Sequence, residues 1–113
     1  MNLPHNAIEE LEENLWAVEG IVPKTPLKRR MSIIRLSDGR LLFHSPMLLE
    51  ESAMQYVESL GTPAFAVIPN GYHRIDAANY AKRYPEIRVI APQASLKKVA
   101  QVVRVDGDYE TLP

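Results

Sequence analysis

Two short runs of mostly apolar, strand-favouring residues, joined by a turn sequence, give the clearest structural signal in the chain. The runs Met31–Leu36 and Arg40–Ser45 are rich in residues that favour strands. They are joined by Ser37-Asp38-Gly39, and Asp-Gly is a preferred pair for a type I′ turn. The pattern therefore predicts an antiparallel β-hairpin over residues 31–45.

Apolar residues at helical spacing follow the hairpin. They predict a helix over about residues 48–60, with one buried stripe made of Leu49, Ala53, Tyr56, Val57 and Leu60. Gly61 is well placed to end this helix as its left-handed C′ residue. A second helix is predicted over about residues 73–84, where Pro85 ends it.

The remaining apolar runs predict strands around these helices. Residues 14–19 are the first strand candidate, with Leu15, Ala17 and Glu19 on one face and Trp16 and Val18 on the other. Residues 64–68 are apolar without alternation, as is typical of a central strand buried on both faces. A short strand is predicted at 88–91, a helix at about 95–101 and a further strand at 102–105. The order is βββαβαβα with one more strand. It predicts an α/β (α+β) fold: a mixed sheet with helices on one face.

Composition excludes several classes of function. The chain has 113 residues, 46% hydrophobic and 24% charged, which suits one globular domain. Thirteen basic and fourteen acidic residues give a net charge of -1 and no cysteine is present, so we expect no nucleic-acid partner and no disulfide. The basic segment 23–30, PKTPLKRR, is broken by two prolines and is expected to be a solvated loop. No secretory signal or run of about 20 apolar residues occurs, so we expect no membrane association and a cytoplasmic location.

Several segments, taken in order, carry a resemblance to a known family. They are Leu15–Gly20, Met31–Pro46, Pro69–His73, Tyr84-Pro85 and Arg88–Pro92. They resemble the metallo-β-lactamase superfamily, in particular an uncharacterised branch described as a domain of unknown function. Members are αββα sandwiches of two αβ halves with the metal between them. The resemblance runs from residue 10 to about 98, so it implies that residues 1–113 form a single truncated domain, half of that sandwich.

The chain departs from the family at the metal-binding loop. After the central strand the family carries His-x-His-x-Asp-His, a spacing that directs imidazoles and a carboxylate at one metal ion. Here Asn70 and Tyr72 replace the leading histidines, and Arg74 and Ile75 replace the Asp-His pair. An aspartate normally ends the hairpin strand, where this chain has His44-Ser45-Pro46. The resemblance therefore implies a degenerate metal site.

A rearranged site can still be assembled from the sequence. His44 and His73 follow predicted strands, and Asp76 comes three residues after His73, on the same side of a helical turn. Imidazole and carboxylate ligands suit zinc. The alternative is structural: Asp76 favours the positive end of its helix, and His44 forms hydrogen bonds at the end of the hairpin. We take the structural alternative as the prediction and expect no cofactor, with zinc as the competing hypothesis.

Three hypotheses about function follow. The first is a noncatalytic domain that forms a homodimer through the open face of its sheet, where Ile34, Leu36 and Leu42 are expected to make a continuous apolar surface. The second is a metal-dependent hydrolase with zinc at His44, His73 and Asp76. The third is a fragment of a longer protein, because residues 106–113 show no pattern that closes a domain. No substrate can be derived from the sequence.

Overall fold

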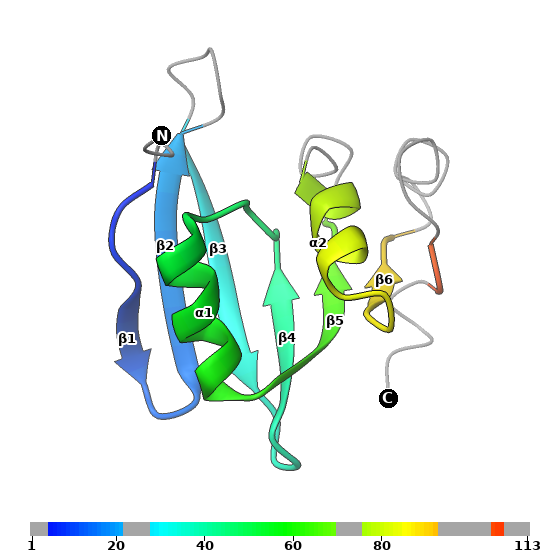
Figure 1. Ribbon diagram of the computed structural model, residues 1–113, viewed down its shortest axis with the longest axis horizontal. Helices are drawn as coiled ribbons and strands as arrows, with labels where there is room; N and C mark the ends of the chain where they lie inside the picture. Colours follow the sequence, from blue (N-terminus) through cyan, green and yellow to red (C-terminus); the bar gives the residue numbers. More distant parts are fainter. Residues whose placement is uncertain (1–4, 22–27, 70–75, 93–104, 108–113) are drawn as a thin grey trace.

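The computed structural model describes residues 5–21, 28–69, 76–92 and 105–107. The described residues form β1 (Glu9–Glu12), β2 (Leu15–Ile21), β3 (Lys28–Arg35), β4 (Arg40–His44), α1 (Glu51–Leu60), β5 (Thr62–Val67), α2 (Ala77–Arg83) and β6 (Arg88–Ile90). The strands lie in one sheet in the order β1-β2-β3-β4-β5-β6. Strands β1 to β4 pair antiparallel, and β4, β5 and β6 pair parallel (Figure 1). The predicted α+β class with a mixed sheet is confirmed.

The predicted hairpin is β3–β4, but its turn differs from the prediction. The amide of Gly39 donates to the carbonyl of Leu36, and the amide of Leu36 donates to that of Arg40. Gly39 has φ 87, while Asp38 is not among the residues with positive φ. A type I′ turn needs positive φ at both residues, so this is a three-residue loop with a left-handed glycine. Its geometry is stabilised by Asp38, whose carboxylate accepts from the backbone amide and side chain of Arg40.

Strands also form where the sequence predicts none. The four residues of β1 are all exposed and three are glutamates, so no apolar alternation marks them. β1 pairs with β2 alone and lies at the edge of the sheet, where acidic side chains discourage further pairing. Strand β3 begins at Lys28 rather than Met31, so the end of the basic segment is strand, not solvated loop. The rest of that segment, residues 22–27, lies outside the described residues.

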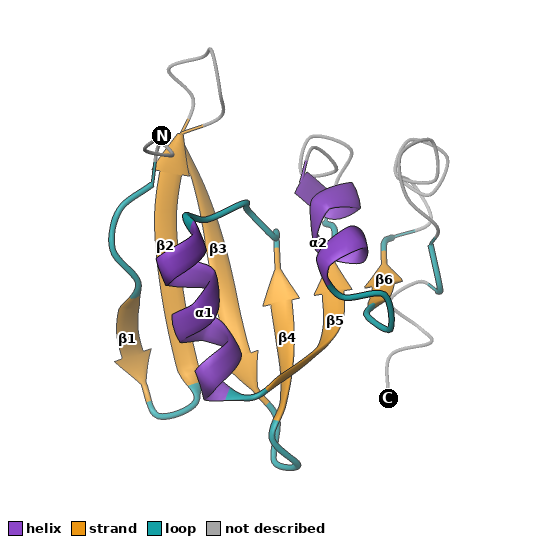
Figure 2. Cartoon of the chain, in the orientation of Figure 1, coloured by secondary structure: helices purple, strands orange, loops and turns teal. Residues whose placement is uncertain are grey.

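The two helices are shorter than predicted and cover one face of the sheet (Figure 2). In α1 the buried residues are Met54 and Val57, whereas Tyr56, expected in the stripe, is 47% exposed. The residues from Pro46 to Glu50, after β4, are irregular, and α1 begins three residues later than predicted. Among the described residues, neither helix has the length and apolarity that a membrane span requires.

Gly61 ends α1, but for a reason other than the predicted one. Its φ of 169 is extended backbone that any residue adopts, not the left-handed C′ conformation. A Cβ at this position would overlap the carbonyl oxygen of Gly39, which itself accepts a hydrogen bond from the amide of Thr62. Glycine is therefore required because the hairpin turn packs closely against the backbone here.

The core lies between the sheet and the two helices. Its largest fully buried side chains include Tyr80 and Phe43, whose rings meet edge to face at 5.1 Å. The strand residues of this cluster are Trp16, Val18, Met31, Ile33, Leu41, Phe43, Ala66 and Val89. Near β6, Gly107 forms a parallel bridge to Ile90, next to the strand predicted at 102–105. Residues 102–104 and the helix predicted at 95–101 are outside the described residues.

The opposite face of the sheet, here called the second face, carries both apolar and polar side chains, among them the ion pair of Glu19 with Arg30 and the exposed His44. Four apolar residues on this face are buried, with at most 4% of their surface exposed, and do not belong to the helix-side cluster: Ala17, Phe65, Val67 and Ile90. Across β2, β3 and β4 the cover is thinner, since Leu15, Ile34 and Leu42 are half-buried and Ile21 is 42% exposed. Ile34, Leu36 and Leu42, which were expected to form a continuous apolar surface, are all half-buried.

Candidate functional site at the carboxyl edge of the sheet

The parallel strands β4 and β5 end at the same edge of the sheet. His44 is the last residue of β4, and α2 begins directly after Asp76. Open α/β sheets hold their ligands beyond the carboxyl ends of parallel strands, so this edge is where the predicted site residues have to meet. Of these, His44 and Asp76 are in the described part of the chain, whereas His73 lies outside it.

Asp76 is buried and fully engaged. Its side chain is 7% exposed, and Oδ2 lies 3.0 Å from a terminal nitrogen of Arg29, which is 10% exposed. The same oxygen accepts a hydrogen bond from the backbone amide of Leu48 at 2.9 Å. The ion pair joins the start of β3 to α2, and the amide bond ties the segment between β4 and α1 to them. Removing the carboxylate would leave a buried guanidinium without its counter-charge, which is costly.

Arg29 is the site residue that sequence reasoning missed. It was placed in a solvated loop because prolines and basic residues surround it. In the structure it lies in β3 and alternates with Met31 and Ile33, which face the helices. That alternation was the available signal. Its Nε is buried and has no hydrogen-bond partner among the described residues, where Asp76 supplies the counter-charge.

His44 projects from the other face. In register it pairs with Ser32 and Val67, which places its side chain on the second face, exposed to solvent. Its Nδ1 lies 3.4 Å from the hydroxyl of Ser45. Ser45 has φ 59, so the backbone turns sharply directly after His44. His44 and Asp76 therefore belong to opposite faces of the sheet.

The described residues do not fit a zinc site that uses Asp76. Its carboxylate is held by a cation and a backbone amide, and a metal ion would compete with both. Within the described ranges, no three His, Cys, Asp or Glu side chains gather closely enough to hold a metal ion. The full set of His44, His73 and Asp76 stays a prediction because His73 is outside those ranges.

Tyr80 holds the segment between β4 and α1 in place through its hydroxyl group. Its hydroxyl donates to the carbonyl oxygen of Met47 at 2.7 Å and lies 3.3 Å from the sulfur of Met31. Burial raises the pKa of Tyr80 far above its usual value. The neutral hydroxyl is thus the stable form, and it can act here only as a structural donor.

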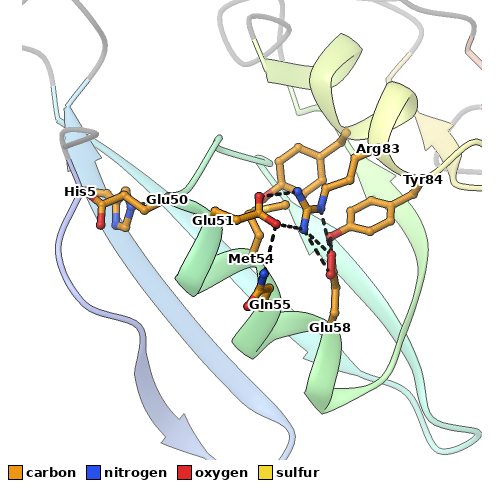
Figure 3. Close-up of polar contacts among 9 residues, drawn as sticks. His5, Glu50, Glu51, Met54, Gln55, Glu58, Arg83 and Tyr84 are labelled. Carbon is orange, nitrogen blue, oxygen red and sulfur yellow. Dashed lines mark hydrogen bonds and ion pairs between the residues drawn. The ribbon is translucent and has the colours of Figure 1, made fainter. Parts of the chain in front are cut away.

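A cluster of charged residues joins the two helices on their outer side (Figure 3). Arg83 of α2 forms ion pairs with Glu51 at 2.8 Å and Glu58 at 2.7 Å, both from α1. The hydrogen bond from Arg83 lowers the pKa of Glu51. Tyr84 also donates to Glu58 at 3.1 Å, and burial raises the pKa of Tyr84 to about 12. These contacts hold α2 against α1 and leave no free group for chemistry among the four.

Solved metallo-β-lactamases share this arrangement of elements. FIM-1 from Pseudomonas aeruginosa, in its mono-zinc form, superposes with a TM-score of 0.68 at 13% identity, over 95% of this chain and 51% of that one. The fold is metallo-β-lactamase-like. The enzyme from Hirschia baltica gives a TM-score of 0.66 at 9% identity, over 96% of this chain and 54% of its own. The metallo-β-lactamase DIM-1 gives a TM-score of 0.68 at 12% identity, over 96% of this chain and 53% of its own.

The extent of the match bounds what it shows. The chain spans about half the length of these solved structures. Identities of this size establish the fold and not the activity. No family model matches the sequence, and no curated protein is similar to it. The prediction of half a metallo-β-lactamase-like sandwich is confirmed at the level of the fold.

Proposed function

We propose that this chain is a noncatalytic metallo-β-lactamase-like unit that works by self-association through the second face of its sheet. The observation that carries the proposal is that apolar side chains lie on both faces of the sheet, while both helices of the described residues cover one face. A sheet of this kind is stable when each face is packed against another layer.

The part of the second face available to a partner is formed by β2, β3 and β4. Leu15, Ile34 and Leu42 are half-buried there, and Ile21 is exposed. Two copies packed sheet on sheet about a two-fold axis would place these residues against each other. Such an interface buries the same residues from both partners, so a single charged substitution acts twice.

The proposed lack of catalysis is supported by the ion pair at the carboxyl edge. Asp76 is bound by Arg29 and by the amide of Leu48, and His44 projects from the opposite face. A hydrolytic metal centre needs several ligands directed at one point with a position left open for water. The contacts of these residues favour a structural role.

The test is the mass of the protein in solution, measured by light scattering. We expect twice the mass of one chain for the wild type and a single-chain mass for Leu42→Lys. Tyr56→Lys is the matched control, because it introduces the same charge at an exposed residue on the helix side and should leave the dimer intact. A wild type that stays monomeric at micromolar concentration contradicts the proposal.

The competing function is a zinc-dependent hydrolase that uses His44, His73 and Asp76. It is favoured by one observation: His44 is solvent-exposed at the edge where α/β folds hold their ligands. Elemental analysis of the purified protein, with zinc titration of the wild type and of His44→Ala/His73→Ala, distinguishes the two. Stoichiometric zinc that is lost in the double variant would establish the hydrolase site, and zinc at background level would exclude it.

A further inference from the structure

A groove of about 380 Å³ lies between the N-terminal segment and α1. Figure 1 shows the segment before β1 running beside the helix. The groove is lined by His5, Asn6, Ala7, Ile8, Glu50, Ser52, Ala53 and Tyr56. Its volume is within the range of clefts that hold small ligands or a few residues of a peptide, roughly 300–1,000 Å³.

The outer wall of the groove is fixed by specific bonds. Nε2 of His5 accepts a hydrogen bond, 3.0 Å long, from the backbone amide of Glu50, the residue just before α1. Figure 3 shows these two residues side by side. The amide of Asn6 donates to the carbonyl of Glu19 at 2.7 Å. Ile8 packs against the helix-side core. The groove is therefore formed before any partner arrives, which lowers the entropy cost of binding.

The most exposed large side chain of the groove is Tyr56. It is 47% exposed, and it is one of three large hydrophobic residues exposed in the described part of the chain. Ser52 and Ala53 precede it on the same side of α1. An aromatic face presented beside small residues offers a shallow apolar floor and a π surface that attracts cations.

Among the described residues around the groove, acidic side chains outnumber basic ones, although Glu19 is paired with Arg30. Residues 5–21 contain five glutamates and no lysine or arginine, and α1 contains Glu51 and Glu58 with no basic residue. Arg83 compensates the two helix glutamates on the far side of α1. Glu50 lines the groove itself, and β1, which begins directly after the groove residue Ile8, contains three glutamates. This distribution attracts a cationic partner and repels an anionic one.

We propose that the groove binds an extended basic peptide segment of another protein, with a lysine or arginine side chain over the ring of Tyr56. The size of the groove, its open aromatic ring and its acidic surroundings each match that occupant. Nothing in the argument depends on the second face, so the two proposals succeed or fail separately.

Fluorescence anisotropy tests the proposal with a labelled peptide of four Lys-Ala repeats and with the matching Glu-Ala peptide. We expect saturable binding of the basic peptide alone, which weakens as salt is raised. Tyr56→Ala should weaken binding about threefold through loss of the cation–π contact. Tyr56→Phe should retain the affinity.

Ser52→Arg places a cation in the groove and should weaken binding by about tenfold or more. Gln55→Arg adds the same charge to the same helix, at an exposed residue that does not line the groove, and should have a much smaller effect. The fluorescence of Trp16 confirms that each variant is folded. Failure of the basic peptide to bind, equal binding of the acidic peptide, or equal losses in the two arginine variants would overturn the proposal.

Discussion

The two faces of the sheet are built from alternate residues of the same strands and differ sharply in their surroundings. On β3, Ile33 faces the helices and has no exposed surface, while its neighbour Ile34 faces the other way and is half-buried. On the helix side, packing within the chain is complete. On the second face, Phe65, Val67 and Ile90 of β5 and β6 are buried, whereas only Ala17 is buried among the large and small apolar residues of β2, β3 and β4 on that face. The difference indicates that the apolar side chains of β2, β3 and β4 are suited to a partner.

The largest expected effect is a difference in stability between variants of Asp76 and His44, the two predicted metal ligands that lie on opposite faces of the sheet. Asp76→Ala leaves Arg29 buried and unpaired and should lower the free energy of unfolding by about 3 to 5 kcal/mol. His44→Ala removes an exposed side chain and should change it by less than about 0.5 kcal/mol. Urea denaturation followed by Trp16 fluorescence measures both. Similar losses in the two variants would show that the faces do not differ at this edge.

The next prediction compares neighbouring isoleucines of one strand. Ile33→Ala should lower the free energy of unfolding by about 2 to 5 kcal/mol, because it opens a cavity in a closed core. Ile34→Ala, measured under dilute conditions where the protein is monomeric, should cost roughly 1 kcal/mol. Equal costs would mean that the second face is already packed within one chain.

A smaller effect is expected at the edge where both faces meet the hairpin turn. Gly61→Ala places a methyl group against the carbonyl of Gly39, and the rearrangement should cost about 1 to 3 kcal/mol. Gly39→Ala has open space around it and suffers only the backbone strain of positive φ, about 1 kcal/mol. Thermal unfolding of both variants ranks them. The reverse ranking would contradict the close packing of the turn against Gly61.

The smallest effect is a dependence of stability on alkaline pH that comes from the helix side of the sheet. The pKa of Tyr84 is raised from 10.0 to about 12 by burial, so the folded protein retains this proton at a pH where the unfolded chain has lost it. The stabilisation is therefore present below pH 10 and is lost as the pH rises from 10 to 12. Tyr84→Phe should flatten stability over this range, apart from the contribution of Tyr80. An unchanged alkaline profile in Tyr84→Phe would rule out a contribution from Tyr84.

How much the sequence could predict depends on whether a feature was local. The hairpin was predictable because its two strand-favouring runs and the turn residues Asp38-Gly39 are adjacent in the chain. Strand β1 was not, because an exposed edge strand has no apolar period. The role of Gly61 depends on a turn 22 positions earlier in sequence, at Gly39.

The sequence could predict where the candidate site lies, but not which residue pairs with Asp76. The carboxyl edge of the parallel strands follows from topology, and His44 lies there as predicted. The partner of Asp76 was hidden, because Arg29 is 47 positions away in sequence and its own neighbours suggested a loop. Ion pairs between distant elements leave no mark on local periodicity.

The most direct test of the account is the unfolding midpoint of the wild type as a function of protein concentration. If the second face joins two copies, association stabilises the folded state and the midpoint should rise with concentration. Leu42→Lys should abolish this dependence, and its dilute-limit midpoint should be modestly lower than that of the wild type, because Leu42 is half-buried in the single chain. A midpoint that is constant for the wild type over a wide range of concentration, together with a single-chain mass, would contradict the central claim.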